Sequence, residues 1–148
     1  MHRILIAVDG SKQADKAIEV GLQIASAQQA EVTFLHVLVP PGTSEYNLIL
    51  HRASAQAEEA GVPSKRELVA GRSISRSIVD YADEIKASLI VVGTRGLGPV
   101  TGALLGSASK GVLKRTERPT LVVHAAHPKN AAASTKPQNP VFEATVGR

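Results

Sequence analysis

Five glycines and two serines gather in residues 93–109, between an apolar segment and a helical one. The segment ahead of them, Ser88–Val92, is short, apolar and rich in β-branched residues, which predicts a buried strand. The segment behind them predicts a helix through Arg115, with Ser107 and Ser109 as candidate N-caps. Glycines let a ligand approach the backbone N–H groups, and a helix N-terminus adds the positive end of its dipole. The loop contains no carboxylate, so its chemistry favours binding of a phosphate; its glycines are Gly93, Gly96, Gly98, Gly102 and Gly106.

The spacing of these glycines excludes two common phosphate motifs. The loop lacks the Gly-Lys-Ser/Thr ending of a Walker A sequence, and Thr101 stands where the third glycine of a dinucleotide fingerprint would follow Gly96 and Gly98. The alternative is an empty loop, because a connection from strand to helix needs flexible residues even where nothing binds. Such connections usually take a few residues, whereas this one takes about a dozen, which favours a functional loop.

Apolar runs alternate with segments of helical periodicity along residues 1–124. Helices are predicted after Ser11, after Ser73 and after the glycine loop, and also over Ser44–Ala60. Strands are predicted at Arg3–Val8, Val32–Val39, Lys65–Val69, Ser88–Val92 and Thr120–Val123. This alternation predicts a single α/β domain with a parallel sheet and helices on both faces. Ligands bind such sheets beyond the carboxyl ends of the strands, where the strand order reverses.

Composition removes several classes of function. The 148 residues are 43% hydrophobic and 3% aromatic, which predicts one domain with an aliphatic core. The absence of cysteine excludes disulfides, thiolate catalysis and cysteine-based zinc sites. Asp9 interrupts the first apolar stretch too early for a signal peptide, and no apolar run approaches the roughly 18 residues of a membrane span. We therefore expect a cytoplasmic protein without membrane insertion.

The net charge of +4 gives little reason to expect nucleic-acid binding. The basic residues form no dense Lys/Arg cluster, and aromatic side chains that could stack on bases are scarce. The charge is more typical of a solvated surface, and we expect no nucleic-acid partner.

The glycine loop resembles the nucleotide loop of the universal stress protein family. That loop has Gly, two residues, Gly, nine residues, Gly, then Ser or Thr, and Gly93, Gly96, Gly106 and Ser107 fit this spacing. The resemblance extends over nearly all of residues 1–124 and includes Val8-Asp9-Gly10-Ser11, Leu35-His36-Val37 and Arg118–Val123. It implies a Rossmann-like fold with five parallel strands in the order 3-2-1-4-5. Asp9 and Gly93 would then follow neighbouring strands at the point where the order reverses.

The resemblance also implies a site for ATP, with Mg²⁺ or Mn²⁺ on the phosphates. Asp9 can accept hydrogen bonds from a ribose or an adenine amine, or help hold the metal; its alternative role is that of a turn residue. Arg95 can reach a phosphate or remain a solvated loop charge, and a lone strand histidine such as His36 is more often structural than catalytic. By the resemblance, Ala7, Asp9 and Val37 line the adenine pocket, Gly93, Thr94, Arg95 and Gly96 hold ribose and phosphate, and Gly106, Ser107 and Ser109 hold the distal phosphates.

These residues do not assemble a recognisable active site. The chain has no Ser-His-Asp order and no His-Glu-x-x-His motif, and the glycine loop contains no lysine, so we expect at most a slow ATPase. The resemblance implies an ATP-binding, nucleotide-dependent regulator in a stress response. Two alternatives remain: a stress-induced interaction module that binds no nucleotide, and an electron-transfer protein of flavodoxin shape. The lack of tryptophan disfavours the second, because a flavin needs aromatic stacking partners.

The pattern stops after residue 124. The composition of residues 125–148 predicts a flexible C-terminal tail, in which Val141-Phe142 can dock on the domain. In the implied strand order, Thr120–Val123 lies at a sheet edge and is uncharged, which predicts a homodimer through this fifth strand. The alternative is that the tail folds back and covers the edge.

Overall fold

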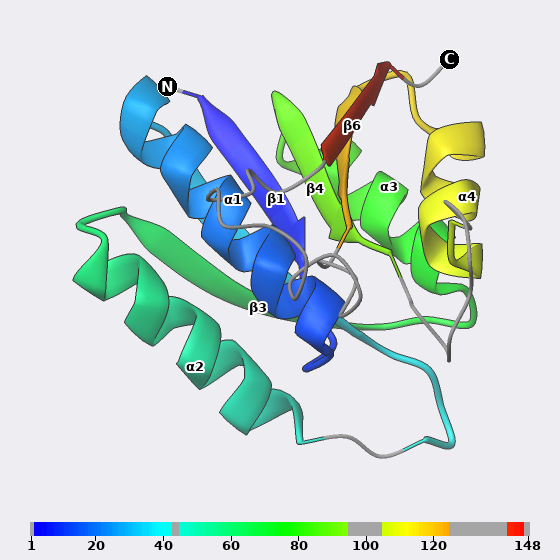
Figure 1. The fold of residues 1–148 in the computed structure, drawn as a ribbon. Helices are drawn as coiled ribbons and strands as arrows, with labels where there is room; N and C mark the ends of the chain where they lie inside the picture. Colours follow the sequence, from blue (N-terminus) through cyan, green and yellow to red (C-terminus); the bar gives the residue numbers. More distant parts are fainter. Residues whose placement is uncertain (1, 43–44, 95–104, 125–141, 147–148) are drawn as a thin grey trace, which may run out of the picture.

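A twisted sheet forms the centre of the molecule (Figure 1). The computed structural model describes residues 2–42, 45–94, 105–124 and 142–146. The sheet order is β3-β2-β1-β4-β5-β6. The first five strands are parallel, and the sixth runs antiparallel to β5. The predicted order 3-2-1-4-5 is therefore confirmed; the strands are β1 (Arg3–Ala7), β2 (Glu31–Leu38), β3 (Ser64–Ala70), β4 (Leu89–Gly93), β5 (Pro119–Val123) and β6 (Phe142–Val146).

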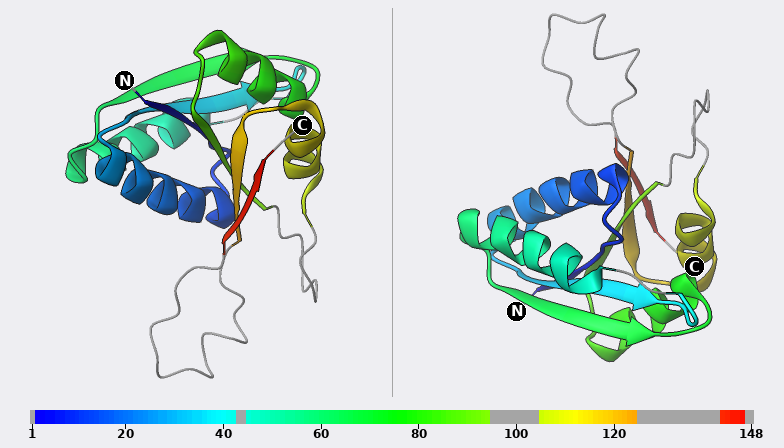
Figure 2. Two further views of the ribbon diagram at one scale, coloured as in Figure 1. Left: turned by 90° about the horizontal axis from the view of Figure 1, so that it is seen from above. Right: turned by 90° about the horizontal axis from the view of Figure 1, so that it is seen from below.

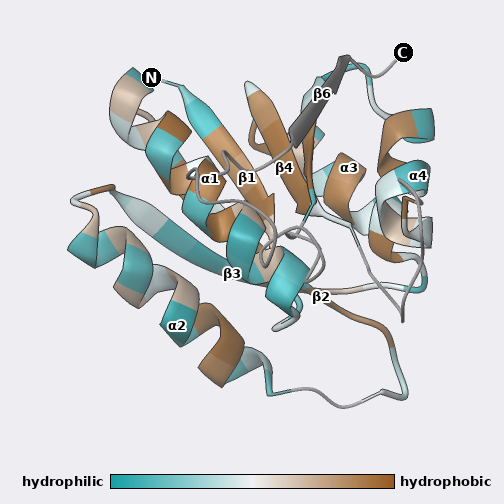
Figure 3. Cartoon of the chain, viewed as in Figure 1, coloured by the Kyte–Doolittle hydropathy of each residue, from teal (hydrophilic) through white to brown (hydrophobic). Residues whose placement is uncertain are grey.

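Helices cover both faces of the sheet (Figure 2). Helices α1 (Lys12–Gln28) and α2 (Tyr46–Glu59) pack on one face, while α3 (Ile74–Glu84) and α4 (Ser107–Arg115) pack on the other. Successive strand side chains point to opposite faces, so Ile4 and Ile6 join the α1/α2 core and Leu5 joins the α3/α4 core. Burial of each large aliphatic side chain contributes about 1.5–3 kcal/mol. The central strands are accordingly hydrophobic along most of their length (Figure 3).

Serine hydroxyls begin two of the helices, as predicted. Ser11 Oγ accepts a hydrogen bond from the Ala14 N–H at 3.1 Å, and Ser73 Oγ accepts one from the Arg76 N–H at 3.3 Å. The prediction that Ser107 or Ser109 caps α4 is wrong. The N-cap is Gly106 in an extended conformation, and both serines lie within the first turn of the helix.

The sheet edge at β5 differs from the expectation. β6 pairs along the whole of β5, from Pro119↔Val146 to Val123↔Phe142. Residues 142–146, which the sequence analysis assigned to a flexible tail, thus add a sixth strand, whereas residues 125–141 lie outside the described residues. The expectation of a free edge at β5 is wrong, because a strand of the same chain satisfies its backbone groups. The pairing agrees with the alternative to a homodimer through this strand, in which the C-terminal tail folds back and covers the edge.

None of the helices in the described part of the chain is both long and apolar enough to cross a membrane.

Candidate functional site

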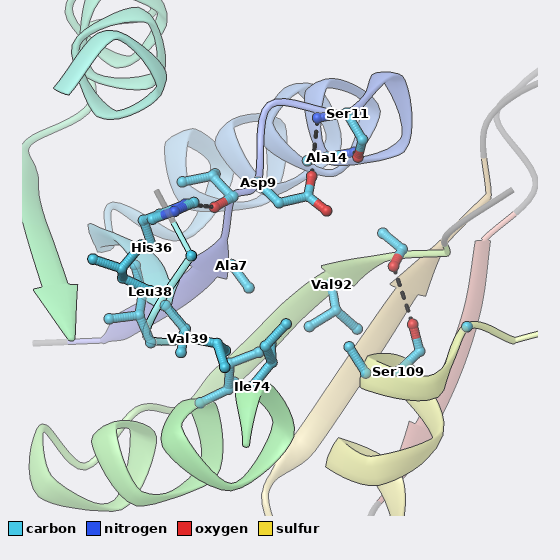
Figure 4. A pocket seen from close by; sticks show the side chains of 18 residues that line it. Ala7, Asp9, Ser11, Ala14, His36, Leu38, Val39, Ile74, Val92 and Ser109 are labelled. Atoms are coloured by element: carbon cyan, nitrogen blue, oxygen red, sulfur yellow. Dashed lines mark hydrogen bonds between the residues drawn. The ribbon is translucent and has the colours of Figure 1, made fainter. Parts of the chain in front are cut away.

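A cavity of about 290 Å³ opens beyond the carboxyl ends of β1, β2 and β4 (Figure 4). The strand order reverses at this point: from β1 the chain adds β2 and β3 on one side of the sheet, and then β4 and β5 on the other. Apolar side chains from both sheet neighbours and from α3 make up most of the wall. The lining residues are Ala7, Val8, Asp9, Ser11, Ala14, Leu35, His36, Val37, Leu38, Val39, Gly42, Ile74, Ile78, Val92, Gly93, Gly106, Ala108 and Ser109.

The ladder between β1 and β2 ends at this cavity. The Val8 N–H still donates to the Leu35 carbonyl oxygen at 2.9 Å, but the paired register stops at Ala7↔Leu35. The Val8 carbonyl oxygen instead lies 2.8 Å from Nδ1 of His36, a residue that is 5% exposed. Because a carbonyl oxygen only accepts, this ring nitrogen carries the hydrogen. In a parallel sheet, the N–H and C=O groups of one residue point to the same neighbouring strand, and this direction alternates from residue to residue. The backbone groups of Val37 therefore point to the same side as those of Leu35, toward β1, but they lie past the end of that strand.

The turn after β1 brings a carboxylate to the same place. Gly10 adopts a φ of 82°, a left-handed conformation that favours glycine, and the turn leads directly into α1. The Ser11 N–H donates to Asp9 Oδ1 at 2.9 Å, which is the turn role that the sequence analysis gave as the alternative for Asp9. Asp9 also lines the cavity, so the turn interaction and a ligand contact are compatible in position.

Gly93 ends β4 against the first turn of α1. A Cβ at this position would lie 2.5 Å from the Gln13 carbonyl oxygen and 2.6 Å from its carbonyl carbon. Real Cβ atoms do not approach backbone atoms this closely, so the packing of α1 on β4 requires glycine here. The glycine therefore has a structural reason that is independent of any ligand.

The N-terminus of α4 forms the opposite wall. Its first backbone N–H groups have no intrahelical partner, and Gly106, Ala108 and Ser109 line the cavity. Ser109 is 1% exposed, and its hydroxyl donates to the Gly93 carbonyl oxygen at 3.0 Å. That bond uses the single hydroxyl hydrogen and ties the two ends of the glycine loop together. In this arrangement Ser109 can accept a hydrogen bond from a ligand but has no second hydrogen to donate to a phosphate.

The described lining contains one carboxylate, Asp9, and one imidazole, His36, but no lysine or arginine. Attraction for an anion within this lining comes from the α4 N-terminus, where the helix dipole is worth about 0.3–1 kcal/mol. Across the described ranges there is also no group of three or more His, Cys, Asp or Glu side chains that could hold a metal ion. A metal would need ligand oxygens in addition to Asp9, as Mg²⁺ commonly takes from phosphates.

The structure brings six of the predicted site residues together around the cavity: Ala7, Asp9, Val37, Gly93, Gly106 and Ser109. Thr94 is buried and is not among the lining residues, and its N–H donates to the Val123 carbonyl oxygen at 3.0 Å. Ser107 is exposed at the start of α4 and is not among the lining residues. Arg95 and Gly96 lie outside the described residues.

Two contributions were missed in the sequence. Ile74 and Ile78 of α3 line the cavity, although the sequence analysis predicted only a helix after Ser73 and no contribution from it to a site. His36 was interpreted as structural, and the ring does make a structural hydrogen bond, but at the cavity wall rather than deep in the core. The sequence did contain a signal for this role, because His36 lies near the carboxyl end of a predicted parallel strand, where ligands bind such sheets.

Comparison with known proteins gives consistent matches. The model of the Universal stress protein family matches residues 1–124. Universal stress protein YxiE of Bacillus subtilis is 31% identical over 146 residues, covering 82% of this chain and 98% of the relative. A universal stress protein from Archaeoglobus fulgidus has a TM-score of 0.72 at 25% identity, covering 82% of this chain and 98% of that one. Another, solved in complex with cAMP, has a TM-score of 0.71 at 28% identity, covering 84% and 98%.

Proposed function

Because the chain belongs to the universal stress protein family, we propose that its cavity binds an adenine nucleotide and that the protein is a nucleotide-dependent regulator in a stress response. ATP, with Mg²⁺ or Mn²⁺ on its phosphates, is the proposed nucleotide. The complex of a related protein with cAMP supports an adenine nucleotide as the ligand class.

The observation that carries the proposal is the backbone of Val37 beside an apolar cavity wall. Its N–H and C=O groups point past the end of β1, where the ladder has stopped. Adenine presents an acceptor, N1, next to a donor, the N6 amino group, and this edge matches one N–H and one C=O from the same residue. Guanine and hypoxanthine present the reverse order, so the same backbone groups would reject them. Apolar neighbours such as Leu38, Val39 and Ile74 suit the faces of a base.

The opposite side of the cavity suits the phosphates. Figure 4 places His36 and Val39 on one side and Ser109 with the α4 N-terminus on the other. A nucleotide whose base lies at Val37 would direct its phosphates toward Gly106, where backbone N–H groups and the helix dipole favour an anion. Asp9, between these sides, would supply a carboxylate oxygen to a metal bound by the phosphates, and the metal would neutralise phosphate charge there.

Calorimetry with ATP, ADP, AMP and GTP tests the proposal. We expect adenine nucleotides to bind with dissociation constants in the micromolar range, about −8 kcal/mol, and ATP to bind more tightly when Mg²⁺ is present. Gly106→Val should abolish binding, since its branched side chain would occupy space at the cavity wall. Ala27→Val, on an exposed part of α1 away from this cavity, is the matched control and should bind normally. Millimolar ATP without a saturable signal would instead support an interaction module that binds no nucleotide.

Ser107 provides a second test of the phosphate end. If its hydroxyl donates to a phosphate, Ser107→Ala should weaken ATP binding about 10- to 100-fold, the effect of losing one hydrogen bond to a charged group. Unchanged affinity would limit its role to the first turn of α4. Hydrolysis of ATP, if present, should be slow, because the described cavity contains no lysine or arginine to stabilise charge on a transferred phosphoryl group.

A further inference from the structure

The hydrogen bond between His36 and Val8 occupies the position of a missing rung in the sheet ladder. Along β1 and β2 the rungs alternate: the Glu31 N–H donates to the His2 carbonyl oxygen at 3.0 Å at one end, and the Val8 N–H donates to the Leu35 carbonyl oxygen at 2.9 Å at the other. The next rung in this sequence would run from the Val37 N–H to the Val8 carbonyl oxygen. That bond would extend the register to Val8↔His36, but the register ends at Ala7↔Leu35.

We infer that His36 is a positioning residue that keeps the ladder open. Its Nδ1–H donates a hydrogen bond to the Val8 carbonyl oxygen at 2.8 Å, and the ring is buried among the residues of the cavity wall. The register includes no rung from the Val37 N–H to this oxygen, so that N–H remains directed at the cavity, where a base can use it. His36 therefore governs recognition of the adenine edge through Val37 without touching the reactive part of the nucleotide.

The chemistry of the ring suits this role. A buried carbonyl oxygen rarely stays without a donor, so removal of the imidazole would favour closure of the rung by the Val37 N–H. Closure would add one residue pair to the ladder and withdraw the donor from the cavity. Asparagine can replace the imidazole in this respect, because its amide nitrogen stands at the same number of bonds from Cα as Nδ1. Leucine has nearly the same shape as asparagine and no donor.

The inference rests on the proposed function for its ligand, but its geometry can be tested in the nucleotide-free protein. Amide hydrogen exchange followed by NMR should show that the Val37 amide exchanges faster than the Leu35 amide within the ladder. In His36→Leu the Val37 amide should become protected, whereas in His36→Asn it should stay as in the parent. A parent protein whose Val37 amide is as protected as that of Leu35 would overturn the inference whether or not a nucleotide binds.

Binding of AMP and inosine monophosphate then tests the functional consequence. The second nucleotide reverses donor and acceptor on the edge that Val37 would read. We expect His36→Leu to weaken AMP binding about 10-fold and to bring the AMP-to-IMP affinity ratio toward one, while His36→Asn keeps the ratio of the parent. His51→Leu, an exposed histidine on α2, is the control. If His36→Leu retains both the affinity and the ratio, or if His36→Asn loses them equally, the assignment of His36 is wrong. If the parent itself binds no adenine nucleotide, the proposed function fails, and the exchange comparison still decides the role of His36.

Discussion

Replacement of Gly93 by alanine should destabilise the protein even when no ligand is present. The added Cβ would lie 2.5 Å from the Gln13 carbonyl oxygen, and relief to an ordinary contact of at least 3.4 Å requires β4 and α1 to separate by about 0.9 Å. Both partners are backbone atoms, so no side chain can rotate away. Separation would loosen the packing of Ala14, Ala17 and Ile18 beneath the helix. Overpacking of this kind costs about 1–3 kcal/mol, and the rigid neighbours place Gly93→Ala near the upper value.

Thermal or urea unfolding of the ligand-free protein measures this cost. About 3 kcal/mol corresponds to a fall in melting temperature of roughly 6–12 °C for a chain of this size. Gly71→Ala is the matched control: its new Cβ would meet the Ser77 hydroxyl, the end of a side chain that can adopt another rotamer. We expect its cost to stay below about 1 kcal/mol. A Gly93→Ala protein that melts within a degree or two of the parent would refute the packing argument and leave phosphate approach as the reason for this glycine.

Three further predictions concern contacts away from the cavity. Burial, together with the nearby Glu67 carboxylate, raises the pKa of Tyr81 from 10.0 to about 12. The neutral phenol therefore contributes to the free energy of unfolding fully below pH 10, and this contribution is lost as the pH rises toward 12. Tyr81→Phe should remove the corresponding loss of stability between pH 10 and 12, measured by unfolding at a series of pH values. Arg118 donates to the Asp83 carboxylate and to the Ala87 carbonyl oxygen, at 2.7 Å each, so Arg118→Ala should cost about 1–2 kcal/mol in urea unfolding. Asp83→Asn should cost less than about 1 kcal/mol, because the Asp83 side chain is 60% exposed. Deletion of residues 142–148 should uncover β5, lowering the melting temperature and producing a dimer by light scattering at micromolar concentration; a stable monomer would show that β6 is dispensable for protecting the edge.

The sequence was sufficient for the parallel sheet because its signals were local and repeated. Buried strands such as Leu89–Gly93 consist of uninterrupted apolar residues, and serines at 11 and 73 mark helix starts by a mechanism that acts within one turn. The position of the cavity followed from the strand order that the family resemblance implied, which places Asp9, shortly after β1, beside Gly93 at the end of β4. The strands and helix starts needed no knowledge of long-range packing, whereas the strand order did.

The features that the sequence did not predict depend on contacts between distant segments. β6 is a weakly patterned segment of five residues, and its pairing with β5 is favourable only because that edge is otherwise open. The cap of α4 was misassigned because the chain is already extended at Gly106 and helical from Ser107, and the serines at 107 and 109 do not reveal which residue precedes the first turn. The bond from Ser109 to Gly93 spans 16 residues, and no spacing rule distinguishes such a hydroxyl from one that faces a ligand.

The reversal of direction at β6 has a practical consequence for attaching the protein to something else. The five parallel strands end at the cavity, but β6 runs the opposite way, so Val146 lies beside Pro119 at the amino ends of the strands. Arg3, at the start of β1, and Val146 consequently both lie at the edge of the sheet opposite the cavity. A fluorophore, surface tether or fused domain joined after Val146 would leave the cavity mouth facing the medium, and a probe intended to report on its occupancy belongs instead near Asp9 or Gly42.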